Sequence, residues 1–380
     1  METVTPYFLI MKLFYSLLFV GIISPAFSQV SMNLRLKLKD TLLVDKYQTP
    51  KNSFKIQKLY MSPGHSRIKN LSAAKKLHNH TIVAVELVYS DYPEGKDFSE
   101  LNRQRIIELF KVLPEAFNNK MVKWSVVKQT GVKKTGGISN YFHGFAIHYR
   151  EFPSYQDENQ LLEDILSGKK EPQDSTLLKV FHRNEKWKNM LVVCDVTGSM
   201  APYTAQLLLW IKANQTLRSM KNIVFFNDDD ERSHNHTKRK DSTGMWTISS
   251  YNYKKVLATA IKAMEKGDHI ENNLEAVCKA IDEYPEDKHK VLMIADNWED
   301  PCDMHLLKYL KEKKIPVRII VCGVENSFNT KYLEIAHATG GTIHTMEDDL
   351  TNLASMNDGT TFKIGKLKYK IAKGKFSQVK

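Results

Sequence analysis

Three oxygen-bearing side chains alternate within one short stretch of the sequence. Asp195, Thr197 and Ser199 follow the apolar run 190–194 and precede a segment of helical character. A tight turn between a buried strand and a helix can aim all three side chains at one point. One carboxylate and two hydroxyls suit a hard cation such as Mg²⁺, which prefers octahedral oxygen ligands and keeps several waters. The alternative is a capped helix start, with Thr197 or Ser199 as the N-cap.

A further acid ends a second apolar run. Asp296 directly follows residues 291–295, which read VLMIA. If both runs are strands of one parallel sheet, Asp296 and Asp195 lie at the same edge of that sheet. A carboxylate in such a position is costly unless it meets a cation or hydrogen-bond donors. Asp296 is therefore the next candidate for the same site.

Strand and helix patterns alternate from residue 188 onwards, which predicts a parallel sheet with helices on both faces. Strands are expected at 190–194, 223–226, 291–295, 317–323 and 342–345, with an antiparallel edge strand near 246–248. Helices are expected at about 202–217, 253–265, 272–283, 303–313, 330–338 and 347–355. The fold class is therefore α/β, with a doubly wound, mostly parallel, six-stranded sheet.

This combination of motif and element order resembles the von Willebrand factor A (vWA) family. The sequence DVTGS at 195–199 matches the D-x-[S/T]-x-S element, the first of three ligand loops in the family's metal-ion-dependent adhesion site. The resemblance covers about 165 of the 380 residues, from 188 to 355. It implies a Rossmann-like fold, with Asp296 as the acid of the third loop. In the family, that acid generally acts through water or a hydroxyl.

The second ligand loop departs from the family pattern. Where the family usually has a threonine, residues 267–274 read GDHIENNL. This stretch is similar to a Gly-Asp-x-x-Glu-Asn variant of some bacterial members, which implies that Asp268 or Glu271 supplies the missing oxygen. The alternative is that both acids stabilise the start of a helix through its dipole.

The first residues are typical of an export signal. Lys12 precedes the apolar run 13–23, and small residues before Gln29 permit cleavage after Ser28. An uncleaved anchor over 7–27 is the alternative, although Lys12 interrupts it and leaves a short span. We therefore expect a protein that is secreted, periplasmic or at the cell surface.

The chain divides into six predicted segments. These are a signal peptide at 1–28, a basic segment at 29–80, a small α+β domain at 81–166, a linker with a lead-in helix at 167–187, the vWA-like domain at 188–355 and a basic β segment at 356–380. The α+β domain is expected to contain a helix that Ser99 caps. In the last segment, Leu367, Tyr369 and Ile371 alternate with lysines, as in a strand with one wet face.

Charge and cysteines limit the possible partners. The net charge is +12, and residues 361–380 carry seven lysines and no acid. Basic ends of this kind can contact an anionic envelope surface, or they can be ordinary solvated strand faces. Export makes nucleic acid a poor partner. A disulfide between Cys278 and Cys302 is permitted in an oxidising compartment, but their spacing does not decide it.

These patterns predict a binding protein and not an enzyme. The sequence has no nucleophile elbow, His-Glu-x-x-His helix or Gly-rich phosphate loop. The resemblance implies a bound Mg²⁺, or Mn²⁺ or Ca²⁺, with an open coordination position that an acidic side chain of a partner protein completes. An envelope scaffold with a purely structural cation is the alternative, and a metal-dependent hydrolase is a weaker one.

Overall fold

The computed structural model describes residues 41–50, 54–119, 121–151, 153–215, 220–227, 244–265, 272–325 and 327–379. The expected signal peptide lies outside this part of the chain. The described residues form two compact units, one from the described parts of 41–78, 82–118 and 122–149, and the other from those of 79–81, 119–121 and 150–379. No helix in these ranges is long and apolar enough to span a membrane.

The first unit is built on a five-stranded mixed sheet with the order β1-β4-β3-β5-β2. Strands β1, β4 and β3 are parallel, and β2 is antiparallel to β5. The strands are β1 (Thr41–Val44), β2 (Lys55–Tyr60), β3 (His80–Ser90), β4 (Lys123–Gln129) and β5 (Gly144–Glu151). The helices are α2 (Leu71–Lys75), α3 (Ser99–Val112) and α4 (Glu115–Asn118).

Helix α3 begins differently from the predicted helix. Ser99 is its first helical residue and not its cap; the cap position is Phe98, and no side chain makes a capping hydrogen bond. The Ser99 amide donates to Asp97 Oδ1 at 2.8 Å. The helix ends at Val112, one residue before Leu113, which precedes Pro114. The helical conformation is disfavoured for a residue that precedes proline, which explains why α3 ends before Leu113 and α4 is a separate short helix.

The second unit is built on a seven-stranded sheet with the order β12-β11-β10-β9-β6-β7-β8. Its strands are β6 (Met190–Asp195), β7 (Met220–Phe226), β8 (Met245–Ser249), β9 (Val291–Asp296), β10 (Val317–Cys322), β11 (Thr342–His344) and β12 (Asp349–Leu350). The five central strands are parallel, whereas β8 and β12 are antiparallel edge strands. This confirms a mostly parallel sheet and the predicted edge strand, but the predicted number of six strands is wrong by one.

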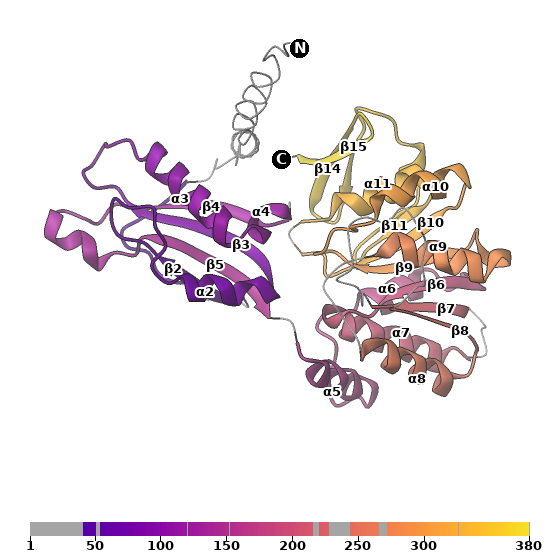
Figure 1. The fold of residues 1–380 in the computed structure, drawn as a ribbon. Coiled ribbons are helices and arrows are strands. Elements are labelled where there is room, and N and C mark those ends of the chain that lie inside the picture. The colour runs from indigo at the N-terminus through magenta and orange to yellow at the C-terminus, as the bar shows by residue number, and fades with distance from the viewer. Residues whose placement is uncertain are drawn as a thin grey trace, which may run out of the picture. The chain divides into compact units, whose positions relative to one another are not determined.

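Helices cover both faces of this sheet (Figure 1). One face carries α5 (Tyr155–Leu166), α6 (Thr176–Arg183), α7 (Ala201–Ala213) and α8 (Tyr253–Met264). The other carries α9 (Asn273–Glu283), α10 (Leu307–Glu312) and α11 (Thr330–Thr339). Successive strand residues alternate between the two cores, with Val192 in one and Val193 in the other. The second unit therefore has the doubly wound architecture that the alternating pattern predicts.

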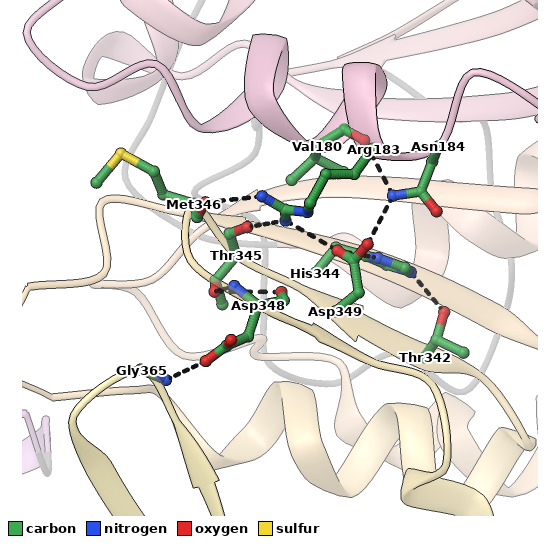
Figure 2. A network of polar contacts seen from close by, with 10 residues as sticks. All are labelled: Val180, Arg183, Asn184, Thr342, His344, Thr345, Met346, Asp348, Asp349 and Gly365. Carbon is green, nitrogen blue, oxygen red and sulfur yellow. Dashed lines mark hydrogen bonds and ion pairs between the residues drawn. The ribbon is translucent and has the colours of Figure 1, made fainter.

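The extra strand replaces an expected helix. The helix predicted at 347–355 is wrong, because this stretch contains the two-residue β12 and a 3₁₀ turn at Leu353–Ser355. In β12, the Asp349 carboxylate accepts hydrogen bonds from Arg183 Nη2, His344 Nδ1 and Asn184 Nδ2, each at 2.9 Å (Figure 2). None of these partners lies within residues 347–355, so the spacing of apolar residues in that stretch could not show that it forms a strand and not a helix.

The same network joins three parts of the unit. Arg183, the last residue of α6, also donates to the carbonyls of Thr345 and Met346, at 2.6 and 2.8 Å. Asp348 Oδ2 accepts from the Gly365 amide at 2.6 Å (Figure 2). The end of α6, the sheet edge and the C-terminal strands are thus held together by polar contacts.

The C-terminal strands form a three-stranded antiparallel meander with the order β13-β14-β15. The strands are β13 (Thr361–Ile364), β14 (Leu367–Ala372) and β15 (Lys375–Val379). Tyr369 and Ile371 are buried and belong to the same core as α11, and Lys368 and Lys370, which alternate with them, are exposed. The predicted alternation in this segment is confirmed.

Candidate metal centre

The candidate site lies where the strand order of the second sheet reverses. Strands β6 and β9 are parallel neighbours, with Cys194 opposite Ile294, and the chain continues outward from them in opposite directions. In sheets of this kind, ligands bind in the crevice at the carboxyl ends of such a strand pair. Asp195 is the last residue of β6, and Asp296 is the last residue of β9.

The first turn is organised by its own aspartate. Asp195 Oδ1 accepts the Thr197 amide at 2.8 Å and the Thr197 hydroxyl at 2.7 Å. Helix α7 follows one 3₁₀ turn later, and neither turn nor helix has a side-chain cap hydrogen bond. The alternative of Thr197 or Ser199 as a capping side chain is therefore wrong, and the Thr197 hydroxyl serves the carboxylate of β6 instead.

Ser199 connects this turn to the second strand. Its exposed side chain donates from Oγ to Asp296 Oδ2 at 2.6 Å, across 97 residues of sequence. The other oxygen, Asp296 Oδ1, accepts the amide of Trp298 at 3.1 Å. The turn after β6 thus supplies two hydroxyls, each bound to the carboxylate of a different strand.

The two carboxylates lie in a buried, negatively charged environment. Asp195 is fully buried and Asp296 is 5% exposed. Burial raises the pKa of Asp296 above its ordinary value, and the hydrogen bond from Ser199 opposes this only in part. Glu299, three residues further along, has its pKa raised to about 8 by burial and by the charge of Asp296. A cation at this edge would stabilise all these carboxylates in their ionised form.

The donor set fits a hard cation. A hydroxyl that donates its one hydrogen to a carboxylate still has lone pairs for a metal ion, so Thr197 and Ser199 can do both at once. Carboxylate and hydroxyl oxygens are ligands that Mg²⁺ accepts. Within the described ranges, no group of three or more His, Cys, Asp or Glu side chains could hold a metal ion. The described residues of the candidate site therefore amount to two aspartates and two hydroxyls.

Asp268 and Glu271 lie outside the described residues, which resume at Asn272. Their part in the site remains a prediction.

A buried glutamate packs against the first turn, and no local sequence pattern predicts this contact. A Cβ atom at Gly198 would lie 2.3 Å from Glu158 Oε1, so the glutamate of α5 occupies the space that a side chain at 198 would need. Glu158 is 8% exposed, and burial raises its pKa to about 7. The turn thus requires glycine between its two hydroxyl residues.

Buried amides fix the third loop. Asn297 is fully buried; its Oδ1 accepts the Asn329 amide at 2.8 Å and its Nδ2 donates to the Ser327 carbonyl at 2.9 Å. These bonds tie the residue after Asp296 to the loop after β10. An Asn that follows a strand-ending Asp is the only sequence signal for this role.

The two cysteines considered for a disulfide differ in their surroundings. Both are present as thiols; Cys278 is buried in α9, whereas Cys302 is exposed. The Cys302 thiol donates to Asn272 Oδ1 at 2.9 Å.

Two comparisons of the sequence with known proteins found no match. No protein-family model matches the chain. No curated protein shows significant similarity to it.

Proposed function

We propose that this protein is an exported, vWA-type binding protein that engages a protein partner through a divalent cation. The observation that supports it best is the pair of hydroxyls on one turn, each hydrogen-bonded to a carboxylate from a different central strand. The position of that turn at the reversal of strand order adds to this.

Each residue has a defined part in the proposal. Thr197 and Ser199 would offer hydroxyl lone pairs to Mg²⁺, or to Mn²⁺ or Ca²⁺. Asp195 and Asp296 would balance the charge of the ion and orient the two hydroxyls. Asp268 or Glu271 would supply a further oxygen from the second loop.

The partner would bind on the exposed side of the ion. Ser199 is exposed although both aspartates are buried, so a cation held there would face solvent on the side of the serine. A carboxylate from a partner protein would complete its coordination there. We propose binding and not catalysis, because the sequence has none of the hydrolase motifs sought above.

The first experiment is calorimetry with Mg²⁺ and with Mn²⁺ on the chain from residue 29. Saturable binding that Asp195→Ala abolishes would support the site. Glu312→Ala is the matched control, because it removes an acid whose side chain is 63% exposed in α10. If the wild-type protein binds neither ion, the proposal fails.

A second experiment separates partner binding from a structural cation. Immobilised polyglutamate serves as the carboxylate probe and polyglutamine as its neutral counterpart. A partner site predicts retention on polyglutamate that needs the cation and is lost in Asp195→Ala. The cation is structural, and the protein is a scaffold, if the ion raises the unfolding temperature but retention on polyglutamate does not change with chelator or with Asp195→Ala.

A further inference from the structure

The C-terminal meander carries all its described lysines on its solvent side. Six lysines between residues 361 and 379 are exposed, and the segment contains no acid. They are Lys363, Lys366, Lys368, Lys370, Lys373 and Lys375. We call this set the lysine face.

The strand register brings these charges close together. Lys363 of β13 lies directly opposite Lys368 of β14. Like charges directly opposite each other across two strands are unfavourable. Lys370 is flanked by Thr361 and Ser377, neither of which can neutralise it. This concentration of positive charge therefore lowers the stability of the meander.

Protection of sheet edges does not account for this arrangement. Lysines on edge strands discourage pairing with other chains. However, Lys368 and Lys370 lie on β14, which is the central strand of the meander.

Two acids that contact the meander, Asp348 and Asp358, bind its backbone amides and not its ammonium groups. Asp358 accepts the amides of Lys373 and Gly374, at 2.7 and 3.0 Å, and so binds backbone and not ammonium groups. Among the described residues, none of the six lysines takes part in an ion pair.

The face is held rigidly on the second unit. Its opposite side carries Phe362, Tyr369 and Phe376, which are buried in the core that also contains α11. The Tyr369 hydroxyl accepts the Phe328 amide at 3.0 Å. The lysines thus project from a fixed sheet and not from a loose tail.

We propose that the lysine face docks the protein onto a bilayer that contains anionic phospholipid. A small sheet with lysines on three strands and turns presents its charges side by side, which suits a planar array of phosphate headgroups. The lysine ammonium group is a point charge, which suits non-specific contact with many headgroups. Bidentate recognition of a single phosphate favours arginine, and this segment contains no arginine. Its aromatic side chains are all buried, so it lacks the stacking platform of single-stranded nucleic acid sites.

Vesicle sedimentation of the mature chain, residues 29–380, tests this inference. The probes are phosphatidylcholine vesicles with and without phosphatidylglycerol. The variant is Lys363→Gln with Lys368→Gln and Lys370→Gln. The control is Lys254→Gln with Lys255→Gln and Lys262→Gln, which removes three exposed lysines from α8.

We expect binding to the anionic vesicles only, weakened by added salt. Each lysine should contribute about fivefold to the affinity, so the triple variant should bind the anionic vesicles roughly 100-fold more weakly than the wild type. Its unfolding temperature should be unchanged. The control should bind nearly as the wild type does. Equal binding to neutral vesicles, or equal losses in variant and control, would overturn the inference. Binding to duplex DNA that the variant loses, with no vesicle binding, would also overturn it and assign the face to nucleic acid.

Discussion

Replacing Asp349 with asparagine removes the charged acceptor at the centre of the network in Figure 2. Arg183 and His344 both donate to Oδ1, and Asn184 donates to Oδ2. Hydrogen bonds to a charged group contribute about 1.5–3 kcal/mol each, and loss of one partner of a fully buried pair costs about 3–5 kcal/mol. Solvent screens this pair in part, because the side chains of Arg183 and Asp349 are 33% and 21% exposed. We therefore expect Asp349→Asn to destabilise the second unit by about 2 kcal/mol.

The loss should depend on pH in a defined direction. Burial alone would raise the pKa of Asp349, but the hydrogen bonds from His344, Arg183 and Asn184 outweigh it and lower the pKa well below its ordinary value. A carboxyl group whose pKa is lower in the folded state stabilises the fold above its unfolded pKa of about 4, and this stabilisation is lost as the pH falls through the folded value. The difference between wild type and variant should therefore be constant near neutral pH and shrink below about pH 4.

Thermal unfolding followed by circular dichroism measures both effects. About 2 kcal/mol corresponds to a decrease of roughly 4–8 °C in the unfolding temperature of a unit of this size. Glu312→Gln is the control, because its 3.9 Å ion pair with Lys308 is exposed and should contribute little. A variant that unfolds within about 1 °C of the wild type at neutral pH would refute the reasoning. So would a difference that grows as the pH falls.

Three further predictions concern single positions. Gly341→Ala should lower the free energy of unfolding by several kcal/mol, because its Cβ would lie 1.8 Å from the Val317 carbonyl oxygen. Gly340→Ala meets no atom within 4 Å and should cost only about 1 kcal/mol, for its positive φ of 74°. Similar losses for the two variants in urea unfolding would contradict this. Glu158→Gln should stabilise the protein by about 1–3 kcal/mol at pH 8 but leave its stability unchanged below about pH 4.5. The reason is that burial raises the pKa of Glu158 to about 7, so the wild-type protein loses stability as the pH rises through this value. A difference between variant and wild type that does not change with pH would contradict this. Gly198→Ala should lower the unfolding temperature, and adding Glu158→Ala should restore most of that decrease. Purely additive decreases would show that the two side chains do not compete for the same space.

Local patterns were enough to predict the central strands and the first turn. The apolar runs before Asp195 and Asp296 predicted two buried strands, and both strands end at those residues in the structure. The alternation of oxygen-bearing residues then placed Thr197 and Ser199 on one turn. Periodicity reports which face of a strand is buried, so it also predicted the exposed lysines around Tyr369.

Contacts between distant segments could not be predicted in this way. Arg183 and Asp349 are 166 residues apart, and only the folded chain shows that they pair. The same holds for Glu158 beside Gly198, since nothing in the local sequence of α5 marks this glutamate as buried. Strand β12 belongs to this class, because its two residues are too few to show a period.

The position of a bound ion tests the central proposal most directly. Crystals of the protein grown with Mn²⁺ would give an anomalous difference peak wherever the ion is held. The proposal predicts one strong peak beside Ser199 Oγ, between the carboxylates of Asp195 and Asp296, and no such peak in Asp195→Ala crystals. A peak elsewhere, or none at this edge of the sheet with Mn²⁺ in excess, would contradict it.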